Sequence, residues 1–141
     1  MKNTIFYIDD EVLESEHYRE KLELEFVVQH ILNVFDDEVE DFKDQIVEMA
    51  PSLLIQDVML PKRDGEINIE RGVEILTSLK ATLRRLHIPV IVFSNRISKE
   101  LEAAILDLEI PSQLIKVLFK PNIGFNELPK EARTMIRKSR S

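Results

Sequence analysis

Short apolar segments alternate with longer amphipathic segments along the chain. The short segments are rich in β-branched and aromatic residues and predict strands at 4–8, 26–34, 53–56, 89–94 and 114–119. The longer segments carry apolar residues three and four positions apart and predict helices at 12–25, 35–49, 72–87, 98–108 and 126–137. Ser98 stands where it can cap the fourth of these helices.

Five strands that alternate with five helices predict an α/β fold with a mainly parallel sheet. Helices cover both faces of such a sheet, which explains why the third and fourth strands are almost entirely apolar. No repeat or flexible linker divides the sequence, so we expect a single domain over residues 1–141. Ligands of these folds bind beyond the carboxyl ends of the strands, and the residues there are the first candidates for function.

Composition and charge exclude several classes of function. The chain has 141 residues, a net charge of −7, no cysteine and three glycines. Disulfides, thiol catalysis, cysteine-bound zinc and a glycine-rich phosphate loop are excluded, and an acidic surface is a poor partner for nucleic acid. Neither a signal peptide nor a membrane span is visible, so we expect a cytoplasmic protein. The three histidines share no metal-ligand spacing.

Polar groups stand at the carboxyl ends of four of the five predicted strands. They are Asp9 and Asp10, then Asp57, Ser94 and Lys120. Three carboxylates at one edge repel one another unless a cation lies between them, and an all-oxygen site of this kind suits Mg²⁺. A lysine and a hydroxyl nearby can hold phosphoryl oxygens. The set therefore predicts phosphoryl transfer to a carboxylate nucleophile.

Four short motifs carry a resemblance to the receiver domains of two-component response regulators, such as the chemotaxis regulator. They are I-D-D-E at 8–11, Q-D-V-M-L-P at 56–61 followed by D-G at 64–65, V-F-S at 92–94, and F-K-P at 119–121. The resemblance spans nearly the whole chain. It implies a flavodoxin-like, doubly wound sheet of five parallel strands in the order 2-1-3-4-5 with five helices.

The resemblance also implies a role for each site residue. Asp57 is the phosphoacceptor, and Asp9, Asp10, Asp57 and the backbone carbonyl of Met59 bind Mg²⁺. Ser94 is the hydroxyl that closes on the phosphoryl group, and Lys120 contacts the same group. The bond between Lys120 and Pro121 is expected to be cis.

The implied protein is a phosphorylation-dependent switch rather than an enzyme, with at most self-catalysed transfer and hydrolysis. Its phosphoryl donor is a sensor histidine kinase or a histidine phosphotransfer protein, and it signals through protein contacts with an output protein. No output domain, nucleic acid or membrane partner is expected within this sequence, and homodimerisation stays open.

Two departures from the family pattern keep alternatives open. Val117 stands where the family usually has an aromatic ring, so a pseudo-receiver that binds proteins without phosphorylation is the second hypothesis. The segment Glu66–Arg71 is an insertion before the third helix, expected to form a loop. A phosphatase of the haloacid dehalogenase type is less well supported, because its nucleophile follows the first strand, whereas Asp57 follows the third.

Overall fold

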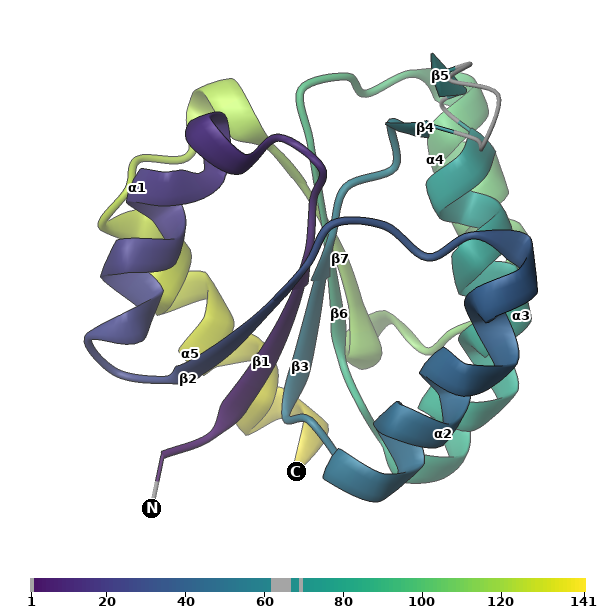
Figure 1. Ribbon diagram of the computed structural model, residues 1–141, viewed down its shortest axis with the longest axis horizontal. Coiled ribbons are helices and arrows are strands. Elements are labelled where there is room, and N and C mark those ends of the chain that lie inside the picture. The colour runs from purple at the N-terminus through teal and green to yellow at the C-terminus, as the bar shows by residue number, and fades with distance from the viewer. Residues whose placement is uncertain (1, 62–66, 69) are drawn as a thin grey trace.

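The computed structural model describes residues 2–61, 67–68 and 70–141, and a five-stranded sheet lies at its centre (Figure 1). All strands of this sheet are parallel, and their order is β2-β1-β3-β6-β7. They are β1 (Thr4–Ile8), β2 (Val27–Ile31), β3 (Leu53–Gln56), β6 (Val90–Ser94) and β7 (Ile115–Phe119). The predicted order of the five main strands, 2-1-3-4-5 along the chain, is confirmed.

Helices cover both faces of the sheet (Figure 1). One face packs on α1 (Val12–Glu23) and α5 (Glu127–Ser139), and the other on α2 (Val39–Met49), α3 (Glu70–Leu86) and α4 (Lys99–Asp107). Every residue of β3 and β6 is buried as a result, which is the reason for their continuous apolar sequences. No helix in the described part of the chain is long and apolar enough to span a membrane.

Alternate side chains of each central strand enter different cores. Phe6 and Leu54 lie in the core under α2, α3 and α4, whereas Tyr7 and Ile55 lie in the core under α1 and α5. This period of two lets each central strand contribute side chains to both cores. The strand ends that carry the candidate site are therefore anchored from both sides.

Two apolar residues at the ends of helices are exposed, although the helical pattern alone favours burial. Met49, in the last turn of α2, is 47% exposed, and Leu13, in the first turn of α1, is 82% exposed. Helix ends have fewer neighbours than helix centres, so the periodic pattern overestimates burial there.

The second strand stops at Ile31 instead of residue 34. Asn33 accepts a hydrogen bond from the Val34 N–H at 2.7 Å and turns the chain there.

A second, two-stranded sheet was not predicted. β4 (Leu60–Pro61) pairs antiparallel with β5 (Ile67–Asn68) just beyond the carboxyl end of β3. The insertion at Glu66–Arg71 is therefore not simply a loop, since it contributes β5 and the first turn of α3; its residues 66 and 69 lie outside the described residues, as do Asp64 and Gly65 of the D-G motif. Strands of two residues are too short to show a period in a sequence.

Candidate functional site

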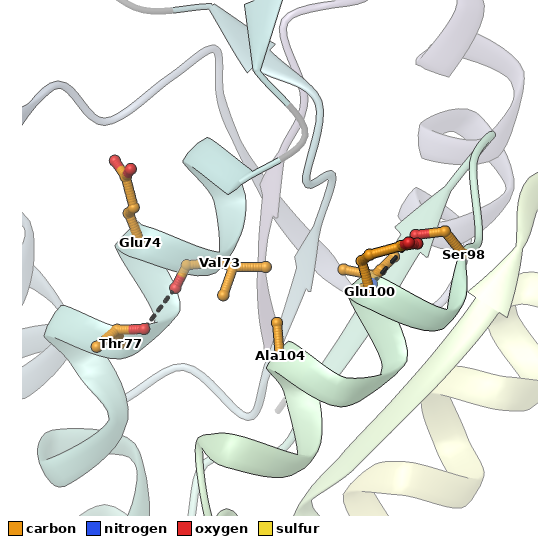
Figure 2. Close-up of a pocket in the computed structure, with 7 residues that line it drawn as sticks. Val73, Glu74, Thr77, Ser98, Glu100 and Ala104 are labelled. Atoms are coloured by element: carbon orange, nitrogen blue, oxygen red, sulfur yellow. Dashed lines mark hydrogen bonds between the residues drawn. The ribbon is translucent and has the colours of Figure 1, made fainter.

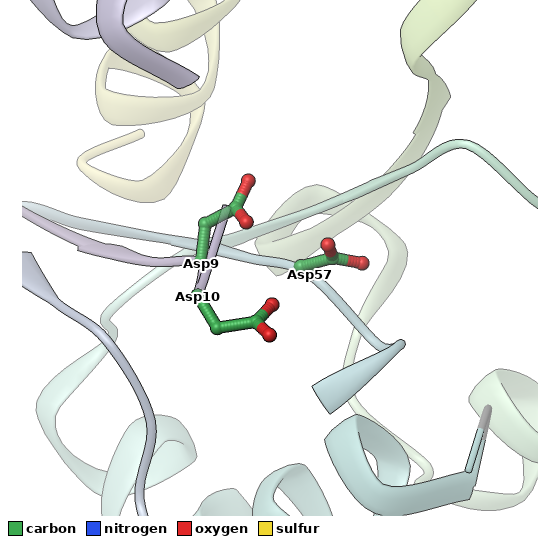
Figure 3. A group of neighbouring side chains, drawn as sticks. All are labelled: Asp9, Asp10 and Asp57. Atoms are coloured by element: carbon green, nitrogen blue, oxygen red, sulfur yellow. The ribbon is translucent and has the colours of Figure 1, made fainter. Parts of the chain in front are cut away.

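The carboxylates of Asp9, Asp10 and Asp57 meet at the carboxyl edge of the sheet (Figure 3). Asp9 and Asp10 directly follow β1, and Asp57 directly follows β3, the neighbouring strand. One oxygen of each carboxylate lies within 4.8 Å of one oxygen of each of the others. Asp9 is 1% exposed and Asp57 is 6% exposed, so the apolar strands hold these charges largely out of water.

Lys120 places its ammonium group between two of these carboxylates. Its Nζ lies 2.9 Å from Asp9 Oδ2 and 3.3 Å from Asp57 Oδ2, and the side chain is 4% exposed. Burial lowers the pKa of Lys120, but the carboxylates of Asp57 and Asp9 together raise it above its ordinary value. The ring of Phe93 supports the ammonium from 5.5 Å. Lys120 therefore stays charged and links β7 to the ends of β1 and β3.

The environment of Asp57 favours a protonated carboxyl more than water does. Burial raises its pKa from 3.8 to about 6, helped by the charge of Asp9 and opposed by Lys120 and by the N–H of Met59. That N–H donates to Asp57 Oδ1 at 3.0 Å, which holds the backbone of Met59 beside the carboxylate. At neutral pH Asp57 is still mostly ionised, as a nucleophile must be.

Asp10 supplies an oxygen that lacks a partner. Its Oδ1 is buried, and it finds no hydrogen bond within the part of the chain that the structure describes. Burial and the neighbouring Asp9 raise the pKa of Asp10. A buried carboxylate oxygen without a donor is costly, and a divalent cation would satisfy it.

The donor set of this cluster fits Mg²⁺. The ion prefers oxygen ligands and binds through one or two carboxylates while it keeps several waters. Asp9, Asp10 and Asp57 offer carboxylate oxygens at one point, and the backbone of Met59 lies next to Asp57. The three carboxylates predicted as metal ligands are thus brought together.

Ser94 lies where the sequence placed it, at the end of β6, and it is completely buried. Its Oγ accepts a hydrogen bond from the N–H of Arg96 at 3.1 Å, so the hydroxyl is engaged with its own loop. The next residue, Asn95, donates to Glu14 of α1 at 2.6 Å. Val117, in β7, packs against the core under α2, α3 and α4.

Three residues with long-range hydrogen bonds near the strand ends were not identified from the sequence as parts of the site. His30 donates from Nε2 to the backbone carbonyl of Asp9 at 2.8 Å, and Tyr18 donates to the carbonyl of Ile123 at 2.7 Å, just after Lys120. Arg71 is buried beside the loop after β2. These partners are far apart in sequence, so no local pattern could reveal them; only the place of His30 near the end of its strand was a signal.

The expectation of a cis bond before Pro121 is wrong. The structure contains no cis peptide bond among its described residues, and the bond from Lys120 to Pro121 is trans. A trans bond is the intrinsically preferred form before proline by about 0.5–1 kcal/mol. It lets residues Lys120–Asn122 form a short 3-10 helix, closed by the Ile123 N–H on the Lys120 carbonyl at 3.0 Å. Lys120 reaches both carboxylates from this conformation.

A cavity of about 210 Å³ lies between α3 and α4 (Figure 2). Its hydroxyl groups are already bonded: Thr77 donates to the Val73 carbonyl at 2.8 Å, and Ser98 accepts from the Leu101 N–H at 3.1 Å as the predicted cap of α4. The described residues that line it include none of the polar residues at the strand ends, which are Asp9, Asp10, Asp57, Ser94 and Lys120. The acidic cluster is therefore the stronger candidate site.

Comparisons with known proteins agree with this architecture. No family model matches the chain, and no curated protein matches its sequence. Among solved structures, a CheY-like response regulator receiver domain from Methanospirillum hungatei JF-1 matches with a TM-score of 0.72 and 16% identity, over 99% of this chain and 98% of that one. The BeF3-activated receiver domain of DrrB matches with a TM-score of 0.69 and 23% identity, over 97% and 99% of the two chains.

The isolated receiver domain of RcsB from Salmonella enterica serovar Typhimurium is a third similar structure. It has a TM-score of 0.62 and 17% identity, over 92% of this chain and 85% of that one. The shared strand order, the helices on both faces and the near-complete coverage identify the architecture. The chain has the fold of response regulator receiver domains.

Proposed function

We propose that this chain is a phosphoacceptor switch of a two-component or phosphorelay system, phosphorylated on Asp57. The observation that carries the proposal is the contact of Lys120 with both Asp9 and Asp57, within a cluster of three strand-end carboxylates. A buried nucleophilic carboxylate, a cation beside it and a group of metal-ligating oxygens are the parts that phosphoryl transfer to an aspartate requires. The receiver-like fold supports the same role.

The proposed reaction starts with an oxygen of ionised Asp57. This oxygen attacks the phosphorus of a phosphohistidine or of an acyl phosphate such as acetyl phosphate. A P–O bond forms to Asp57 while the bond from phosphorus to the donor breaks, and the electron pair leaves with the imidazole or the acetate. Mg²⁺ bound by Asp9, Asp10, Asp57 and the Met59 carbonyl would offset the negative charge on the phosphoryl oxygens.

Lys120 and Ser94 take part after the transfer. The ammonium group that faces Asp57 at 3.3 Å can pair with a phosphoryl oxygen. Ser94 Oγ accepts from the N–H of Arg96, and its O–H can donate to a second phosphoryl oxygen. A shift of Ser94 toward the phosphoryl group would carry the loop from Asn95 to Ser98 with it, through the bond from the Arg96 N–H, and would change the surface next to α4.

The proposed partners follow from this chemistry. A sensor histidine kinase or a histidine phosphotransfer protein supplies the phosphoryl group, and an output protein reads the altered surface. Residues 1–141 would form one receiver domain, located in the cytoplasm, that signals by protein contacts rather than as an enzyme.

The test is phosphorylation in vitro. The protein is incubated with acetyl phosphate and Mg²⁺, and the phospho-form is measured by intact mass. The proposal expects one added phosphoryl group in the wild-type protein, none in Asp57→Asn, and none when EDTA replaces Mg²⁺. Rapid release of phosphate over many turnovers would instead indicate a hydrolase.

The pseudo-receiver hypothesis rests on Val117. This side chain is part of the core contacts of β7 and is not an aromatic ring that can turn between two positions. A protein that forms no adduct with acetyl phosphate in Mg²⁺, yet keeps its fold, would support this second hypothesis over the first.

A further inference from the structure

Arg71 is a buried arginine that joins the start of α3 to the loop after β2. Its side chain is 3% exposed. One terminal nitrogen donates to the backbone carbonyl of Val34, and the other lies 2.8 Å from Asp36 Oδ1 and 3.4 Å from Glu74 Oε2. Val34 belongs to the loop after β2, Asp36 begins the short 3-10 helix Asp36–Glu38 that follows this loop, and Glu74 is on α3 itself.

The position of Arg71 is unfavourable for the helix alone. A positive charge in the first turn of a helix opposes the helix dipole, and a buried guanidinium needs partners for its charge. Asp36 and Glu74 are exposed carboxylates, so the burial is entirely on the side of Arg71. A residue that breaks a local rule in this way is expected to serve the tertiary structure or the function.

The residue after Arg71 packs directly against the phosphoacceptor segment. The N–H of Gly72 donates to the Val58 carbonyl at 2.9 Å, and the carbonyl of Gly72 accepts from Gln56 Nε2 at 3.3 Å. A Cβ at position 72 would lie 2.3 Å from the Val58 Cα and 2.7 Å from the Asp57 carbonyl oxygen. The first turn of α3 thus lies against the backbone of Asp57 and Val58 and the side chain of Gln56.

The loop after β2 also holds the other end of the same segment. Asn33 donates from Nδ2 to the Pro61 carbonyl at 2.7 Å. The backbone from Val58 to Pro61 is therefore fixed at its start through Gly72 and at its end through Asn33. Met59, whose N–H bonds to Asp57 Oδ1, lies between these two anchors.

We infer that Arg71 is a positioning residue of the acidic site, which acts through Gly72 to hold the backbone of Met59 against Asp57. This inference deepens the proposed function, because the carbonyl of Met59 is a proposed metal ligand there. Asn33 is its partner anchor at the other end of the segment. The loop after β2 is connected to both ends of the segment, through the bond of Arg71 to Val34 and through the bond of Asn33 to Pro61.

The test compares Arg71→Met, Arg71→Lys and a control, Arg133→Met, which breaks the ion pair of Arg133 with Glu25 instead. Amide hydrogen exchange of the metal-free protein is followed at Met59 and Gly72, with Ile55 in the buried strand β3 as the internal reference. Mg²⁺ affinity is measured by calorimetry on the same samples. Asn33→Ala is the second route to the answer if Arg71→Met does not fold.

In Arg71→Met we expect exchange at Met59 and Gly72 to accelerate relative to Ile55, and Mg²⁺ affinity to fall by about 10–100-fold, as for other residues that orient ligands. Arg71→Lys should recover part of both effects, and Arg133→Met should show neither. Equal acceleration at all three amides with unchanged Mg²⁺ affinity would overturn the inference, because it would show a purely global loss of stability.

The exchange measurement is independent of phosphorylation. If Asp57 takes no phosphoryl group but Arg71→Met still releases the Met59 amide selectively, the proposed function fails and the positioning role stands. If Asp57 is phosphorylated and the Met59 amide is unaffected in both Arg71→Met and Asn33→Ala, the positioning role fails alone.

Discussion

The ammonium group of Lys120 lies 2.9 Å from a carboxylate oxygen of Asp9, and the two side chains are only 4% and 1% exposed. Removal of one partner from such a pair leaves a buried charge without compensation. We therefore expect Lys120→Met to lower the free energy of unfolding of the metal-free protein by roughly 3–5 kcal/mol at pH 7.5. Urea unfolding measures the loss.

The control for this change is Lys116→Met. Lys116 lies 2.8 Å from Glu131, but its side chain is 40% exposed, and pairs of this kind contribute only about 0–1 kcal/mol. The difference between the two variants should shrink at pH 5, because protonation of Asp57 removes one uncompensated charge. A loss of the same size in both variants would contradict the assigned role of Lys120.

The raised pKa of Asp57 predicts a pH-dependent stability in the absence of metal. Its pKa is 3.8 ordinarily and about 6 in the folded protein, so folding favours the protonated carboxyl. The stability that this group contributes is present below pH 4 and is lost as the pH rises through 6. Asp57→Asn should therefore stabilise the metal-free protein by roughly 1–3 kcal/mol at pH 7.5 and by much less at pH 4.

Mg²⁺ should reverse the order of stability of the wild-type protein and Asp57→Asn. The ion binds the ionised carboxylates, so it should stabilise the wild-type protein more than Asp57→Asn at pH 7.5, and this effect should weaken as the pH falls below 6. Thermal unfolding with Mg²⁺ or with EDTA measures it. An Asp57→Asn variant that gains as much from Mg²⁺ as the wild type would show that Asp57 is not a ligand.

Gly72→Ala tests the close approach of α3 to the phosphoacceptor segment. The new Cβ would lie 2.3 Å from the backbone of Val58, so α3 or the segment must move, and we expect a loss of roughly 1–3 kcal/mol together with slower phosphorylation. Gly124→Ala is the matched control, because its nearest neighbour is the end of the Glu127 side chain at 3.0 Å. The control should change stability by less than about 0.5 kcal/mol.

Ser94→Ala separates phosphorylation from the response to it. We expect the variant to accept a phosphoryl group, while the shifts of backbone resonances in residues 95–98 that follow phosphorylation in the wild type are largely lost. Ser98→Ala removes only the cap of α4 and should cost about 1 kcal/mol while it keeps those shifts. If the resonances of residues 95–98 shift in Ser94→Ala as much as in the wild-type protein, the Ser94 hydroxyl does not cause the response of this loop to phosphorylation.

The sequence predicted those features that depend on strand periodicity and on parallel topology. Asp9, Asp10, Asp57, Ser94 and Lys120 each stand at the end of an apolar run, and parallel strands bring their carboxyl ends to one edge. The position of the candidate site thus follows from the amino-acid pattern alone. The strand order followed from the resemblance.

The features that the sequence did not predict depend on contacts between distant residues. The bond of His30 to the Asp9 carbonyl and the burial of Arg71 join loops that are unrelated in sequence. The pairing of Leu60–Pro61 with Ile67–Asn68 is too short to leave a pattern. The cis bond after Lys120 came from resemblance alone, and the structure has it trans.

The most direct test of the central claim is the location of the phosphoryl group. The protein is phosphorylated with acetyl phosphate and Mg²⁺ and then treated with borohydride, which reduces an acyl phosphate to an alcohol and so converts the modified aspartate to homoserine. Peptide mass spectrometry then identifies the residue. We predict homoserine at position 57 and at neither Asp9 nor Asp10; homoserine at another position, or at none, would contradict the account.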